Sequence, residues 1–186
     1  SSAASDVYKR QLDARDGLGR TPLVVAVVHG RKRCVDVLLD GGADPETPSG
    51  HRSRPLAYAA FRGDAALCAR LLGAGADPNK KAADGWTALH VAARQGAADV
   101  VRLLLARGAS RDARTGTGRT ALVVATAFGE LQTVRALLRA GARPDLNLLA
   151  MDPAEAEASL FPLLQTVRSE TEARERVRRG LATLRA

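Results

Sequence analysis

Three histidines and two cysteines are the residues of this 186-residue chain best suited to bind a metal ion or to take part in catalysis. The histidines are His29, His51 and His90, and none has a partner three or four residues away that would help to hold a metal. Cys34 and Cys68 are not at a chelating spacing either, and we expect both to be buried and to behave as small apolar residues. No nucleophile, base and orienting residue form a recognisable set. The sequence therefore predicts no metal, no cofactor and no enzyme activity.

The segment from Thr115 to Thr120, TGTGRT, has a faint likeness to a loop that binds phosphate groups. The motif for such a loop requires a glycine at position 113 and a lysine at position 119. This chain has Ala113 and Arg119 instead, and no apolar strand pattern leads into the segment. We therefore expect no nucleotide site there.

The chain is basic, with a formal net charge of +8 from 28 Lys and Arg against 20 Asp and Glu. Most of the basic residues are arginines, and such a surface would attract acidic partners. A coding sequence rich in G and C would also enrich arginine, alanine and glycine, so both explanations stay open. Aromatic residues make up only 3% of the chain, and binding of nucleic acid by base stacking is not expected.

The elements that must position these side chains follow a period of 33 residues. Equivalent residues recur four times along the chain: Leu23, Leu56, Leu89 and Leu122; Gly30, Gly63, Gly96 and Gly129; Ala43, Ala76, Ala109 and Ala142. A fixed period of this length indicates a protein built by stacking small units, each of which covers the apolar face of its neighbour.

The third unit, Asp84 to Ala109, is the most regular and predicts two short helices. Thr87 is placed to cap the first helix through its hydroxyl group, and Gly96 is placed to end it. The second helix is expected at 98–106, where valines and leucines are apolar almost all round. Helices this short are marginal alone, so the stack is the folding unit.

The period, together with TALHVAA at 87–93, GRTPL at 19–23 and GRTAL at 118–122, resembles the ankyrin repeat family. The resemblance implies an all-α solenoid of stacked helix-turn-helix units with hairpin loops. It places an ankyrin repeat domain at 12–145, with four repeats at about 19–48, 52–81, 85–114 and 118–145.

Two departures from the family pattern concern the polar positions. Arg54 stands where the other repeats have threonine, so the second repeat should lack that helix cap. In the family, a histidine at the position of His90 bonds to the backbone and to the repeat threonine. Here the equivalents are Val24, Ala57 and Val123, and we expect a weak polar ladder between repeats and more reliance on apolar packing.

The two ends of the chain do not fit the repeat. Residues 1–11 are interpreted as a non-native adapter remnant or as a flexible leader. Residues 146–186 have apolar residues at helical spacing and a break near Pro162. These C-terminal helices are expected either to cap the fourth repeat or to bind a partner, and both remain open.

The function implied by the resemblance is a non-catalytic protein-protein interaction module with a concave surface for a partner protein. Carried over by register, the candidate partner-binding residues are Arg20, His29, Phe61, Arg62, Trp86, Arg94, Gln95, Arg119 and Phe128. Trp86 could instead pack on its own hairpin. The alternatives are a structural fragment of a larger ankyrin-containing protein and a binder of acidic ligands or nucleic acid.

We leave open whether the partner is acidic. A monomer is expected, in the cytoplasm or the nucleus of the cell. No apolar run approaches the length of a membrane-spanning helix, roughly 18 residues, so no membrane partner is expected.

Overall fold

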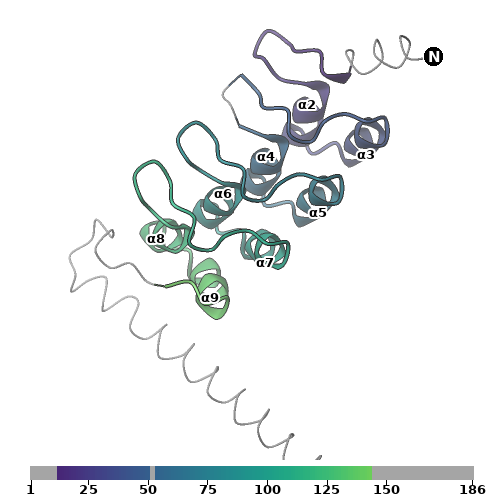
Figure 1. Cartoon of the computed structure of the whole chain (residues 1–186). Helices are drawn as coiled ribbons and strands as arrows, with labels where there is room; N and C mark the ends of the chain where they lie inside the picture. Colours follow the sequence, from purple (N-terminus) through teal and green to yellow (C-terminus); the bar gives the residue numbers. More distant parts are fainter. Residues whose placement is uncertain (1–11, 51–52, 144–186) are drawn as a thin grey trace, which may run out of the picture.

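The computed structural model describes residues 12–50 and 53–143, and in these ranges the fold is all-helical, without strands. This confirms the predicted all-α solenoid. The helices are α2 (Pro22–Val28), α3 (Lys32–Asp40), α4 (Pro55–Phe61), α5 (Ala65–Gly73), α6 (Ala88–Arg94), α7 (Ala98–Ala106), α8 (Ala121–Ala127) and α9 (Leu131–Arg139). Figure 1 shows the first helices of the repeats in one row, the second helices in another, and the hairpin loops on the side of the first row.

The start of each first helix follows from the residue types there. Thr21 Oγ1 accepts a hydrogen bond from the backbone N–H of Val24 at 3.3 Å, and Thr120 repeats this in α8. Pro55 occupies the first turn of α4, where its missing N–H costs nothing. Arg54 makes no capping bond to this helix, as expected from the loss of threonine.

The core runs the length of the stack between the two rows of helices. Leucines at the repeated position, such as Leu23 and Leu89, are about 1% exposed, and Leu104 in α7 is fully buried. Each first helix contacts the first helix of the next repeat and the second helix of its own. Alanines such as Ala59 and Ala92 are also fully buried, and their small size lets neighbouring helices approach closely.

The expectation for the cysteines is right for Cys68 and wrong for Cys34. Cys68 is fully buried in α5, and burial raises the pKa of its thiol to about 12, so it is an inert core residue. Cys34 is exposed, although its equivalent in the third repeat, Val100, is fully buried. The reason is position in the stack: α5 lies beside α7 and helps to cover Val100, whereas no described helix lies on that side of α3.

Among the described residues, the histidine contacts between repeats are made by His90, and long side chains at the hairpin bases add further polar contacts. Arg15 Nη1 donates to the carbonyl of Pro48 at 2.7 Å, and Lys81 Nζ donates to that of Arg114 at 3.2 Å, each 33 residues on. Pro48 shares this register but has no side-chain donor. Arg54 Nη1 reaches the Lys81 carbonyl at 2.8 Å in its place.

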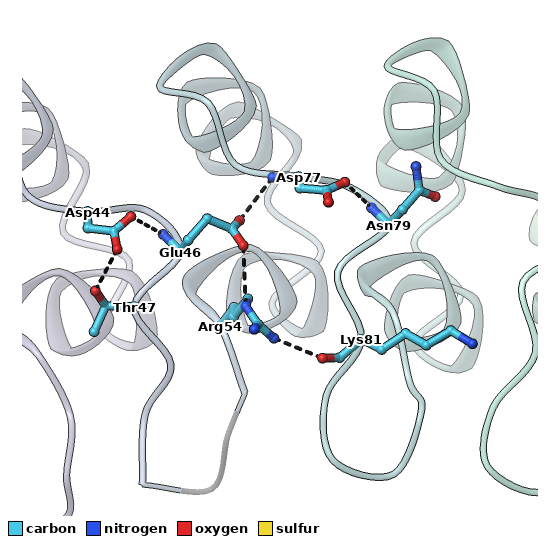
Figure 2. A network of polar contacts seen from close by, with 7 residues as sticks. All are labelled: Asp44, Glu46, Thr47, Arg54, Asp77, Asn79 and Lys81. Carbon is cyan, nitrogen blue, oxygen red and sulfur yellow. Dashed lines mark hydrogen bonds and ion pairs between the residues drawn. The ribbon is translucent and has the colours of Figure 1, made fainter.

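Figure 2 shows the network around Arg54, which joins the loops of successive repeats. Arg54 Nε forms an ion pair with Glu46 Oε2 at 3.3 Å, and Glu46 Oε1 accepts from the backbone N–H of Asp77 at 2.9 Å. Asn79, 33 residues after Glu46, has the same role, since its Oδ1 accepts from the backbone N–H of Ser110 at 2.7 Å. The side that carries the hairpins is thereby held at a regular spacing.

Candidate partner-binding surface

The nine candidate residues lie on the hairpin loops and at the ends of the first helices, and we call them the hairpin strip: Arg20, His29, Phe61, Arg62, Trp86, Arg94, Gln95, Arg119 and Phe128. Seven of the nine are exposed, while Arg20 and Trp86 are half-buried. They belong to or flank the first helices α2, α4, α6 and α8, and these helices form one row in Figure 1.

Two polar members of the hairpin strip are held by the preceding repeat. Arg62 Nη1 donates to the carbonyl of Val28 at 2.8 Å, and Gln95 Nε2 donates to the carbonyl of Phe61 at 3.2 Å. Both side chains reach back 34 residues, to the last residue of the neighbouring first helix. This repeated contact reduces the freedom of the two side chains, so they lose less entropy when a partner binds.

The two phenylalanines of the hairpin strip are both exposed apolar side chains. Phe61 is 57% exposed and Phe128 is 52% exposed. The guanidinium carbon of Arg94 lies 5.2 Å from the centre of the Phe128 ring, which is within the range of a cation–π contact. Exposed aromatic and arginine side chains in contact are typical of the residues that anchor protein interfaces.

The arginines of the hairpin strip differ in whether a carboxylate neutralises them. Arg20 forms an ion pair with Asp16 at 2.8 Å. The pKa of Asp16 is lowered by hydrogen bonds from the Arg20 backbone and side chain, so the carboxylate stays ionised. In the described part of the chain, no carboxylate lies within ion-pair distance of Arg62, Arg94 or Arg119.

Trp86 packs on its own hairpin and first helix. Its ring is tilted by 56° against that of His90, with the ring centres 6.0 Å apart, and the side chain packs against the core. This contact corresponds to the packing role, one of the two interpretations of this residue. His90 is fully buried, and its Nε2 lies 3.0 Å from the carbonyl of Ala113 and 3.1 Å from that of Arg119, both in the next hairpin.

A pocket of about 370 Å³ lies on the exposed side of α4, and we call it the α4 pocket. It is lined by Val28, Ser53, Ala57, Tyr58, Phe61, Arg62 and Val91. Only Phe61 and Arg62 of this lining belong to the hairpin strip. Val28 and Ser53 also stand at register positions of the concave surface, whereas Ala57, Tyr58 and Val91 were not expected there. Tyr58 is a usable signal because the equivalent residues in the other repeats are valines.

The segment from Thr115 to Thr120 forms the hairpin turn that its register predicts. Thr115 Oγ1 accepts from the backbone N–H of Arg119 at 3.2 Å, and the N–H of Gly116 donates to the carbonyl of Asp84 in the previous hairpin at 2.7 Å. Within the described ranges, no group of His, Cys, Asp or Glu is arranged to hold a metal ion. None of the helices searched there is both long and apolar enough to cross a membrane.

Paired short helices, stacked at a spacing of 33 residues and joined by hairpins, define this molecule as a helical repeat protein. A family model of one ankyrin repeat matches residues 18–49, and a model of three ankyrin repeats matches residues 56–147. The chain therefore belongs to the ankyrin repeat family, whose repeats are generally protein-protein interaction modules and are typically non-catalytic. A comparison with curated proteins finds no match.

Proposed function

We propose that this protein is a non-catalytic recognition module that binds an acidic segment of a partner protein along the hairpin strip. The observation that carries the proposal is that arginines without a carboxylate partner and exposed aromatic rings lie on the same face of the stack. Arg62, Arg94 and Arg119 have no carboxylate neighbour in the described residues, and they share the strip with the exposed rings of Phe61 and Phe128.

Arginine suits this role for two physical reasons. Its planar guanidinium can donate two parallel hydrogen bonds to a carboxylate, and it can stack on an aromatic ring, as Arg94 does on Phe128. A carboxylate from a partner would meet a positive charge that no internal acid offsets. The charge complementarity would favour acidic partners and speed their association.

The test begins with a partner captured from a cell extract and then measures its affinity for charge-reversed variants. Arg62→Glu together with Arg94→Glu should weaken binding by about 10-fold to 100-fold, because both charges would then repel an acidic segment. The matched control is Arg33→Glu with Arg107→Glu. These two arginines are exposed, lie in the row of second helices and have no ion pair among the described residues.

The thermal midpoint should fall only slightly in Arg62→Glu with Arg94→Glu, which loses the exposed contacts to Val28 and Phe128, and should stay nearly unchanged in the control pair. Equal weakening by both pairs would show that only net charge matters and would overturn the proposal. A nucleic acid partner would be revealed instead by two results: the affinity falls steeply as the salt concentration rises, and binding persists after protein is removed from the captured material.

A further inference from the structure

Two positions in the lining of the α4 pocket have small residues in the second repeat and larger residues in the other repeats. Ser53 is equivalent to Arg20, Trp86 and Arg119 in the repeat register, and Ala57 is equivalent to Val24, His90 and Val123. In the third repeat, the rings of Trp86 and His90 stand at these two register positions, with their centres 6.0 Å apart. The second repeat lacks both rings, and its two small residues at these positions line the α4 pocket.

The lining of the α4 pocket is mostly apolar and is held in place before anything binds. Val28, Ala57, Phe61 and Val91 contribute aliphatic and aromatic surface. Tyr58 also lines the pocket, and its hydroxyl group is already bonded to Ser49 Oγ at 2.9 Å. The tyrosine therefore needs no polar group from an occupant, and an apolar side chain can cover its ring without leaving a donor unpaired.

Arg62 adds a positive charge to the lining of the α4 pocket. Its Nη1 donates to the carbonyl of Val28, and this contact fixes the guanidinium group above Gly30, where an added Cβ atom would lie 2.5 Å from Arg62 Nη2. The contact with Val28 uses one of the five N–H donors of the guanidinium group. A carboxylate next to an inserted apolar side chain would therefore find a fixed cation within the same pocket.

We propose that the α4 pocket receives one apolar side chain, of the size of leucine or phenylalanine, from an acidic segment of a partner protein. This inference deepens the proposed function, on which it rests for the acidic character of the partner. The α4 pocket selects the type of residue at one position of the partner segment. The arginines of the hairpin strip select for the negative charge of that segment. The α4 pocket, at about 370 Å³, is large enough to admit a side chain of this size. It also lies at the small end of the range for whole small ligands, roughly 300–1,000 Å³, so a small ligand is included in the test.

The experiment uses the full chain and a panel of short fluorescent peptides made of Asp, Glu, Ser and Gly, with one central position set to Leu, Phe, Ala or Lys. Affinity is measured by fluorescence anisotropy. Leu and Phe should bind about tenfold more tightly than Ala, because each buries apolar surface in the α4 pocket. Equal affinity for all central residues would overturn the inference.

Variants that fill the pocket provide the structural control. Ser53→Trp copies the third repeat and should remove the preference for Leu over Ala while leaving a weak attraction to acidic peptides. Ala57→Val copies the first and fourth repeats, so the fold tolerates it there, and it should reduce the preference in part. Ser110→Trp, the same change at an exposed loop residue away from the pocket, should leave the preference intact.

The outcomes separate this inference from the proposed function. Acidic peptides that need Arg62 and Arg94 but show no preference at the central position would sustain the proposed function and overturn the inference. A Leu preference that Ser53→Trp abolishes, in peptides that bind equally well without acidic residues, would sustain the pocket and overturn the acidic partner.

Binding of N-acetyl-leucine amide as tightly as the peptide would show a small-molecule site. A dimer in sedimentation that Ser53→Trp dissociates would show a second copy, and either of these results would overturn the inference.

Discussion

His90 is the one histidine of the described residues that is built into the stack. Thr87 N–H donates to its Nδ1 at 3.2 Å, so the ring proton lies on Nε2, which faces the carbonyls of Ala113 and Arg119. A second proton on Nδ1 would remove the acceptor for Thr87. Burial is the main cause that lowers the pKa of His90 below its ordinary value of 6.5, so the folded protein favours the neutral ring.

This pKa shift predicts a stability that depends on pH. As pH falls below 6.5, the unfolded chain takes up a proton at His90 that the folded chain resists, so the free energy of unfolding should decrease and then level off below the folded-state pKa. His90→Val should remove this decrease and should cost about 1–3 kcal/mol above pH 6.5, because buried backbone groups lose their partner. Chemical denaturation across pH measures both effects.

The control for the pH dependence is His29→Val, since His29 is exposed and its loss should leave the decrease in place. If the free energy of unfolding of the His90→Val variant decreased below pH 6.5 as steeply as that of the wild type, the buried ring would not be the cause of the pH dependence. The wild type and the two variants are compared in the same buffers, so any other contribution that depends on pH is common to all three proteins.

At the scale of the element, successive hairpins touch through their backbones. Gly85 has a φ of +79°, and a Cβ atom added there would lie 2.5 Å from the backbone nitrogen of Gly116 in the next hairpin. That nitrogen donates to the carbonyl of Asp84. Gly108 has a similar φ of +84°, but a Cβ atom added to Gly108 would have no neighbouring atom within 4 Å.

These two glycines give a matched prediction. Gly108→Ala should cost only the strain of a left-handed backbone, about 1–2 kcal/mol. Gly85→Ala should cost that and about 1 kcal/mol more, because the methyl group also pushes apart the hydrogen bond between hairpins. Urea denaturation measures both. Equal losses of unfolding free energy in the two variants would mean that the hairpin shifts to accommodate the methyl group, and that the close approach of the hairpins contributes nothing to stability.

For the whole molecule, each repeat depends on its neighbours, so the stack need not be equally stable along its length. The α6 and α7 pair has a described repeat on each side, and Leu104 between them is fully buried. The first repeat has a described neighbour on one side only, the second repeat, and its other face carries an open pocket of about 680 Å³ that includes the exposed Cys34.

Hydrogen exchange should follow this difference. The backbone amides of α2 and α3 should exchange faster than those of α6 and α7, because fewer packed contacts hold them. Mass spectrometry of peptic fragments, with rates normalised to those of the unfolded chain, measures the order. Slower exchange in α2 and α3 would show that an additional contact covers the first repeat.

Much of this protein is determined by residues that act locally or at a fixed period. The 33-residue register placed the helices, because leucine, glycine and threonine at repeated positions impose the same turn and the same buried face each time. The second helix expected at 98–106 is found there. The absence of a side-chain cap on α4 could be predicted from Arg54 alone. The interpretation of residues 1–11 and 146–186 lies outside the described residues and stays a prediction.

The tertiary structure decided the features that depend on which side chains meet across repeats. Arg54 reaches the Lys81 carbonyl because Pro48 has no side-chain donor, and no single repeat contains all three residues. Cys34 is exposed while its equivalents are buried, because burial depends on a neighbour rather than on the residue itself. The α4 pocket arises in the same way: Ser53 and Ala57 are unremarkable in sequence and become a site only where Val28 and Val91 from the flanking repeats complete its lining.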